Sequence, residues 1–170
     1  MPLKLKIEVS SVTEQETLSN WDAIVYHVVM RLTLDPQLYA VCRLPVSSDI
    51  PDWAVKGSFF SINKTLDELS IVCDQQDVPL GIQSEQGWNM FKVQGPLDFT
   101  LTGILASIAN PLAQAQVSIF AISTFDTDYV MIKASHLKVA VECLKSAGFF
   151  LGWAWVLIAD LWALIFGWSK

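Results

Sequence analysis

The order of apolar segments between residues 90 and 148 constrains the fold of this chain more than any other feature of the sequence. Two helical patterns alternate with three strand patterns, and short polar turns separate them. The run VSIFAIS (117–123) is apolar almost throughout, which is typical of a strand covered on both faces, so we expect it at the centre of a sheet. This order predicts an α+β fold, in which helices cover one face of an antiparallel sheet. The expected elements are strands at 90–94, 117–123 and 129–133 and helices at 97–115 and 136–147.

Residues 38–94 repeat the same plan in a shorter form. The expected elements are a strand at 38–44, one helical turn near 50–55, a hairpin of strands at 59–63 and 69–73, and the strand at 90–94. The chain therefore divides into four parts. They are an N-terminal extension at 1–31 with a strand pattern at 3–9 and a helical pattern at 13–31, a first, degenerate unit at 32–94, a second unit at 95–148 without an obvious last strand, and an apolar, Trp-rich tail at 149–170.

The charge balance argues against nucleic acid as a partner. The 11 Lys and Arg residues against 17 Asp and Glu residues give a net charge of −6, so no basic patch can neutralise phosphates. Cys42, Cys73 and Cys143 lack CxxC spacing, which excludes a disulfide framework and a cysteine zinc site and fits a reducing compartment. No histidine–carboxylate–nucleophile spacing and no phosphate-loop motif is present. We therefore expect no catalytic residues, no metal and no cofactor.

The C-terminal stretch 149–168 carries a single charge, Asp160. A helix of this length would be on the order of 30 Å long, near the thickness of a bilayer core. Because apolar side chains surround the helical wheel, we expect an apolar C-terminal helix that meets a membrane or another chain. A buried helix, a buried strand or an interface with a second chain remains the alternative. The protein is expected to be cytoplasmic, either free or anchored to a membrane through this tail.

Four sequence segments carry a resemblance to a known family. They are YAVCRLP (39–45), FFSINKTLDELSIVC (59–73), GPLDFTLTGILASIANPLAQAQVSIFAISTFDTDYVMIK (95–133) and LKSAGF (144–149). In these segments the chain resembles the tandem ACT-domain proteins related to the CASTOR amino-acid sensors. The resemblance implies ferredoxin-like βαββαβ units in tandem, a non-catalytic regulatory role, binding of small effectors at domain interfaces, and a homo-oligomer. An ACT unit ends with a fourth strand, which would begin at Phe149. Either the tail supplies that strand, the unit borrows one, or the unit is incomplete.

Two polar loops are candidates for a ligand site. The first precedes a predicted helix, where free N–H groups attract a carboxylate, and the second joins two strands and carries carboxylates that could hold an ammonium group. Together they suit a zwitterionic amino acid. Capping of the helix by Asp98 and Thr100, and turn formation by Asp126 and Asp128, are equally good explanations of these residues. The candidate ligand-binding residues are Asp98, Phe99, Thr100, Thr102 and Gly103 in the first loop and Ser123, Thr124, Phe125 and Asp128 around the second.

The resemblance adds to the second loop, because Thr124, Phe125 and Asp128 align with ligand-contacting residues of the CASTOR arginine sensors. Leu101 stands where those sensors have an acidic residue, which favours a smaller or less basic ligand than arginine. The function we expect is a regulatory module that binds an amino acid at an ACT-domain interface. The alternative is a structural ACT dimer without a ligand, held at a membrane or partner by its tail. A third hypothesis is a regulatory fragment of an enzyme, and the chain has no room for the catalytic domain itself.

Overall fold

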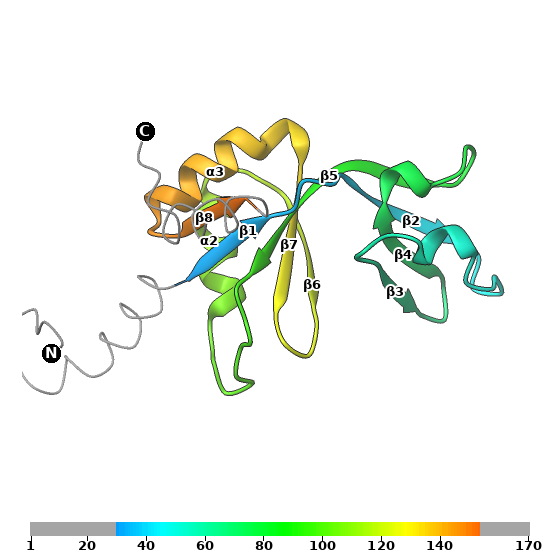
Figure 1. The fold of residues 1–170 in the computed structure, drawn as a ribbon, viewed down its shortest axis with the longest axis horizontal. Helices are drawn as coiled ribbons and strands as arrows, with labels where there is room; N and C mark the ends of the chain where they lie inside the picture. Colours follow the sequence, from blue (N-terminus) through cyan, green and yellow to red (C-terminus); the bar gives the residue numbers. More distant parts are fainter. Residues whose placement is uncertain (1–29, 154–170) are drawn as a thin grey trace, which may run out of the picture.

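The structure is a computed structural model that describes residues 30–153 as one eight-stranded sheet and two α-helices (Figure 1). The sheet runs in the order β3-β4-β2-β5-β1-β8, and β7 pairs with β5 and carries β6 on its other side. The elements are β1 (Arg31–Leu34), β2 (Tyr39–Leu44), the 3-10 turn η1 (Asp52–Val55), β3 (Ser61–Lys64), β4 (Leu69–Asp74), the 3-10 turn η2 (Gln75–Asp77), β5 (Ser84–Val93), α2 (Ile104–Gln114), β6 (Ile119–Ser123), β7 (Asp128–Lys133), the 3-10 turn η3 (Ala134–His136), α3 (Leu137–Ser146) and β8 (Phe150–Trp153).

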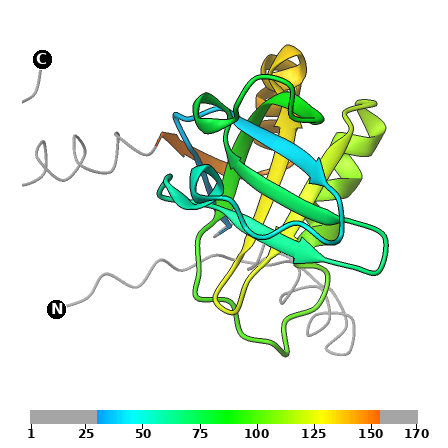
Figure 2. The same ribbon diagram turned by 90° about the vertical axis from the view of Figure 1, so that its right-hand side faces the viewer.

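The long strand β5 joins two halves of the sheet. Its first part pairs with β2, from Ser84 opposite Cys42 to Trp88 opposite Tyr39. Its second part pairs with β7 on one side and with β1 on the other. Figure 2 looks onto the half formed by β2, β3 and β4, which lies in front of β6 and β7. A single strand twice as long as the predicted 90–94 therefore serves both repeats of the sequence pattern.

The main core lies between α2, α3 and one face of the second half of the sheet. Helix α2 buries Ile104, Ile108 and Leu112, which recur every fourth residue and so share one face of the helix. Side chains alternate along a strand, so Phe91 and Val93 of β5 point to this same core. Burying each of these large side chains contributes about 1.5–3 kcal/mol. The helices therefore cover one face of this half of the sheet.

The opposite face of β5 and β7 is covered by the first half of the sheet. Met90 and Met131 point to this side and are buried against Tyr39 and Val72 from β2 and β4. Phe59 and Tyr129 pack at the edge of this cluster. The two halves thus form a second packed layer without a helix between them.

The predicted strands and helices between 38 and 147 are confirmed in kind, and two predictions of position are wrong. The helix expected at 97–115 begins only at Ile104, because residues 97–103 form a loop that ends at Gly103 with a φ of 78°. The second concerns the strand expected at 117–123. Residues 119–123 do form a strand, but β6 pairs with β7 alone and so lies at an edge of the described sheet. Of this strand, Ile122 is buried, whereas Ile119 and Phe120 are half-buried. The apolar run thus forms an edge strand, and one side of its backbone has no strand partner among residues 30–153.

The two ends of the described chain lie side by side and differ from expectation. Strand β8 pairs in parallel with β1, and β1 lies between β5 and β8 (Figure 1). Strand β1 was not predicted from the sequence. The helix expected at 13–31 is wrong at Arg31, where β1 begins. The rest of that segment and the strand expected at 3–9 lie outside the described residues.

The apolar C-terminal helix expected at 149–168 is wrong at its start, because Phe150–Trp153 form β8. The tail therefore supplies a final strand after α3, and the first of the alternatives for the missing strand is correct. Residues 154–170 lie outside the described part of the chain. Within residues 30–153, no helix is both long and apolar enough to cross a membrane.

Candidate functional site

The loop between β5 and α2 and the turn between β6 and β7 are joined by direct contacts. The backbone N–H of Leu97 donates to the carbonyl oxygen of Asp126 at 2.8 Å. A Cβ atom on Gly95 would lie 2.6 Å from that same oxygen, so a glycine is required for this approach. The buried hydroxyl of Thr127 donates to the carbonyl oxygen of Val93 at 2.6 Å. These contacts bring together the two polar loops that the sequence singled out.

Helix α2 begins without a side-chain cap. Its N-cap residue is Gly103, which has a φ of 78° in the left-handed region where glycine is tolerated, and no side chain caps the N–H groups of the first turn. The first N–H groups of the helix are therefore free to meet an anion, which the helix dipole also favours. Asp98 and Thr100, whose capping role was an alternative explanation, do not cap this helix.

Asp98 closes a turn within its own loop instead. Its Oδ1 atom accepts hydrogen bonds from the Thr100 hydroxyl at 2.7 Å and from the Thr100 backbone N–H at 2.8 Å. These two bonds favour the charged carboxylate and hold the pKa of Asp98 below its usual range. The loop therefore places a carboxylate ahead of the helix at neutral pH.

The turn between β6 and β7 is held by its own side chains. The Thr124 hydroxyl and backbone N–H both donate to the carbonyl oxygen of Thr127, at 2.8 and 2.9 Å. Asp128 is the first residue of β7, and its Oδ1 atom accepts a hydrogen bond from the Ser123 hydroxyl at 2.6 Å. Thr124 and Thr127 are thus turn-forming residues, whereas Asp128 presents its carboxylate from the end of a strand.

A cavity of about 320 Å³ lies between the two loops and the first turn of α2. The structure places every candidate site residue at this cavity except Thr100 and Thr102. The rings of Phe99 and Phe125 meet edge to face, with 5.2 Å between centroids, and remain 76% and 80% exposed, so they stand at its rim. The apolar wall was not predicted as a group, because only the polar character of the two loops indicated a ligand site. The residues lining the cavity are Leu97, Asp98, Phe99, Leu101, Gly103, Ile104, Leu105, Ser123, Thr124, Phe125, Thr127 and Asp128.

The arrangement offers two opposite poles in one cavity. The N-terminus of α2 is partially positive, and the carboxylates of Asp98 and Asp128 are negative. No group of three or more His, Cys, Asp or Glu side chains that could hold a metal ion is found in the described range 30–153. The two poles suit recognition of a small molecule that carries both a negative and a positive group.

Comparison with known proteins gives a consistent result. The family model described as the ACT domain matches residues 83–146, and a second model, which describes an N-terminal domain, matches residues 37–80. The chain is 32% identical over 135 residues to the rat protein named cytosolic arginine sensor for mTORC1 subunit 1, and the human protein of that name is also 32% identical. This match covers 67% of the chain but 41% of the relative, so the chain spans about two fifths of the length of the curated relatives it matches.

Two solved structures share the fold. A crystal structure of a protein from Agobacterium tumefaciens superposes with a TM-score of 0.70 at 39% identity, covering 73% of this chain and 92% of that one. A protein from Vibrio cholerae superposes with a TM-score of 0.62 at 15% identity, covering 75% of this chain and 96% of that one. The first is a close relative over nearly its whole length, and the second shows the fold alone.

Proposed function

We propose that this chain, which belongs to the ACT-domain family and is CASTOR-like, is a non-catalytic regulatory module that binds a free amino acid. The proposed site is the cavity between the loop at 97–103, the start of α2 and the turn at 123–128. The cavity volume of about 320 Å³ lies at the lower end of the range for small-molecule sites, about 300–1,000 Å³. A cavity of this volume fits a molecule of amino-acid size rather than a nucleotide or a large cofactor.

The observation that carries the proposal is the pairing of an uncapped helix start with the Asp128 carboxylate in one cavity. A bound amino acid would direct its carboxylate to the free N–H groups of α2 and its ammonium group to Asp128. Helix N-termini bind carboxylates and other anions in this way. Both poles belong to this chain, and the contacts between Leu97 and Asp126 fix them relative to each other.

The wall of the cavity favours a side chain that is less basic than arginine. Leu97, Leu101 and Leu105 contribute apolar surface, and Phe99 and Phe125 stand at the rim. Apart from Asp128, the one carboxylate that lines the cavity is Asp98, whose Oδ1 atom already accepts two hydrogen bonds from Thr100. The leucines offer a guanidinium group no further acceptor to replace water, and burying an unpaired charge is costly. The relatives named as arginine sensors therefore suggest the class of ligand, and Leu101 argues for a neutral amino acid.

We further propose a cytoplasmic protein built from two ACT-like units that share β5. The strand order β3-β4-β2-β5 in one half and the helix-covered strands β5, β7 and β6 in the other support this division. Its boundary between residues 94 and 95 stays a prediction.

The alternative function is a structural ACT dimer that binds no small ligand and is held at a membrane or partner by its tail. The apolar edge strand β6 favours it, because within residues 30–153 one side of this strand is unpaired. Residues 154–170, which would provide the tail, are outside the described structure.

Calorimetric titration of the full chain with each of the twenty amino acids separates these functions. Heat of binding from one or a few neutral amino acids at micromolar to millimolar concentration supports sensing. No heat from any amino acid, together with a stable dimer in sedimentation, supports the structural role and contradicts the proposed one.

A further inference from the structure

A second cavity, of about 240 Å³, lies on the face of the sheet away from α2 and α3. The strand register places Thr33, Lys92 and Tyr129 opposite one another on β1, β5 and β7, so the three side chains form one row. Side chains alternate along β5, so Lys92 points away from the helix core that Phe91 and Val93 enter. This cavity is therefore separate from the one beside α2, and we name it the Lys92 cavity.

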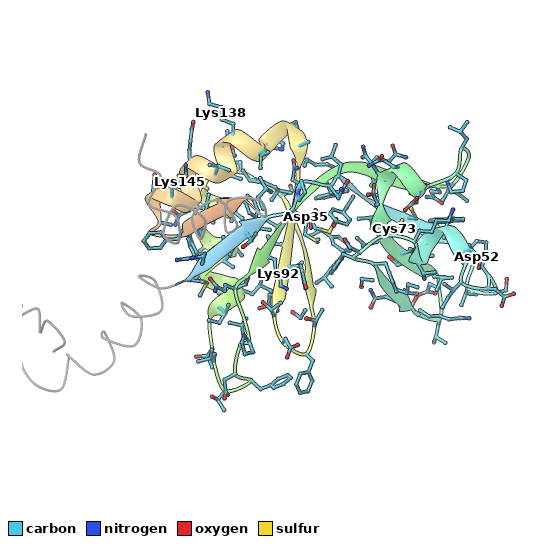
Figure 3. All side chains as sticks on the ribbon, viewed as in Figure 1. Asp35, Asp52, Cys73, Lys92, Lys138 and Lys145 are labelled. Atoms are coloured by element: carbon cyan, nitrogen blue, oxygen red, sulfur yellow. The ribbon has the colours of Figure 1, made fainter. Side chains whose placement is uncertain are left out.

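Two opposite charges border the Lys92 cavity without neutralising each other. Figure 3 labels Asp35 and Lys92 in the middle of the molecule, where the two halves of the sheet meet. The structure records no ion pair for either residue within the described range 30–153. The Lys92 ammonium lies 5.8 Å from the centre of the Tyr129 ring, within reach of a weak cation–π contact. Its three donors therefore remain available to an anion from solution.

The Asp35 carboxylate is held in place from two sides. Its Oδ1 atom accepts a hydrogen bond from the backbone N–H of Gln37 at 2.9 Å. Its backbone N–H donates to the carbonyl oxygen of Met90 at 2.9 Å, which fixes the residue against β5. The hydroxyl of the buried Tyr39 also donates a hydrogen bond to this carboxylate. Burial first, and then the charge and the hydrogen bond of Asp35, raise the pKa of that hydroxyl. The carboxylate is thus fixed by the Gln37 N–H and the Tyr39 hydroxyl, and its remaining lone pairs can accept a hydrogen bond from a ligand in the cavity.

Aromatic rings form an apolar wall between these charges. The rings of Phe59 and Tyr129 lie 4.6 Å apart between centroids at an angle of 47°. Phe59 in turn meets the Tyr39 ring edge to face, with 5.8 Å between centroids. Met90, which is 2% exposed, forms the floor. This wall is rigid, because each ring packs on another ring from a different strand or loop, and rigid walls lower the entropy cost of binding.

We propose that the Lys92 cavity is a second ligand site, which binds a small neutral amino acid in its zwitterionic form. The ligand's carboxylate meets Lys92, its ammonium group meets Asp35, and its aliphatic side chain lies against Phe59 and Tyr129. The volume of about 240 Å³ is below the usual range for drug-sized ligands, which restricts the site to small molecules. The site is independent of the proposed function, because it uses other residues on the opposite face of β5 and β7.

The test uses the full 170-residue chain, labelled with ¹⁵N and titrated with L-leucine while amide chemical shifts are followed. We expect saturable shifts at the amides of Thr33, Asp35, Phe59 and Lys92. Lys92→Gln and Asp35→Asn should each weaken this binding about tenfold or more, which corresponds to the loss of a charge-assisted hydrogen bond. Asn at position 35 still accepts the hydrogen bond from Gln37, so the local turn is kept.

Three controls make the outcome decisive. Lys138→Gln, on the exposed side of α3, should leave leucine binding unchanged, and Lys92→Arg, which keeps the charge, should retain it. 4-Methylpentanoate, which lacks the ammonium group, and 3-methylbutylamine, which lacks the carboxylate, should each bind far more weakly than leucine. The two analogues and Lys92→Arg keep the test valid if Lys92→Gln fails to fold.

Unchanged leucine affinity in Lys92→Gln, or equal affinity for 4-methylpentanoate and leucine, overturns the proposal. Shifts confined to residues 97–105 and 123–128 also overturn it while supporting the site beside α2. Shifts confined to the Lys92 cavity support this second site and count against the first one.

Discussion

Replacing Gly95 by alanine should separate the two loops of the proposed ligand site. The new Cβ would lie 2.6 Å from the carbonyl oxygen of Asp126 and 3.2 Å from the Cβ of Thr127. Both neighbours are parts of the turn itself rather than the end of a flexible side chain, so the turn has to move. That movement stretches the hydrogen bond from the Leu97 N–H to Asp126, which is 2.8 Å long.

The expected cost is the sum of two effects. Overfilling a well-packed position costs about 1–3 kcal/mol, and a weakened hydrogen bond costs about 0.5–1.5 kcal/mol. Because part of the strain relaxes, we expect a loss of about 2 kcal/mol in the free energy of unfolding. For a chain of this size, this loss lowers the melting temperature by about 4–8 °C.

Thermal unfolding followed by circular dichroism measures this effect. The matched control is Gly57→Ala, because a Cβ at Gly57 would meet its nearest atom at 3.5 Å, an ordinary contact. The control should change stability by less than about 0.5 kcal/mol. A Gly95→Ala protein that melts with the wild type would show that the loops are not held together by the contact described here.

Other predictions concern the core and the buried groups. Thr127→Val removes the hydroxyl that donates to the Val93 carbonyl at 2.6 Å, so the free energy of unfolding in urea should fall by about 1–3 kcal/mol; an unchanged urea midpoint would contradict the contact. Leu112→Ala in the fully buried face of α2 should cost about 2–5 kcal/mol, whereas Leu66→Ala, at a residue 95% exposed, should cost less than about 0.5 kcal/mol; equal melting temperatures would refute the placement of α2. Burial raises the pKa of the Cys143 thiol, so at pH 8 a thiol reagent should label Cys143 more slowly in the folded than in the urea-unfolded protein; equal rates would place this thiol at the surface.

Local sequence patterns predicted most of the helices and strands. The errors arose where the structure depends on the pairing of strands that are distant in the sequence. Strand β7 was predicted because a polar turn precedes a run of apolar residues, and both signals are local. The position of β6 at the sheet edge depends on which strand lies beyond it, and an apolar run does not carry that information. Strand β8 was expected as part of a helix, because a uniformly apolar segment has no periodicity that separates the two states.

The two cavities differ in how much of them the sequence contained. Most polar residues of the first site lie in two short loops, so Asp98 and Asp128 could be singled out by residue type and turn position. Its apolar wall, including Leu105, follows only from where α2 begins. The Lys92 cavity combines residues from four separate segments, and β1, which carries one of them, was not predicted. Such a site becomes visible only when the strand register is known.

The most direct test of the proposed function is the affinity of the Asp128→Asn variant for the amino acid that gives the strongest calorimetric signal. Asparagine keeps an oxygen for the Ser123 hydroxyl and removes only the charge, so the fold should be retained. We predict a loss of about 1–3 kcal/mol in binding free energy, or roughly 5- to 150-fold in Kd. Asp49→Asn, at an exposed residue in the loop before η1, should bind with wild-type affinity. Equal affinities for Asp128→Asn and Asp49→Asn would contradict the proposal that Asp128 holds the ammonium group of a bound amino acid.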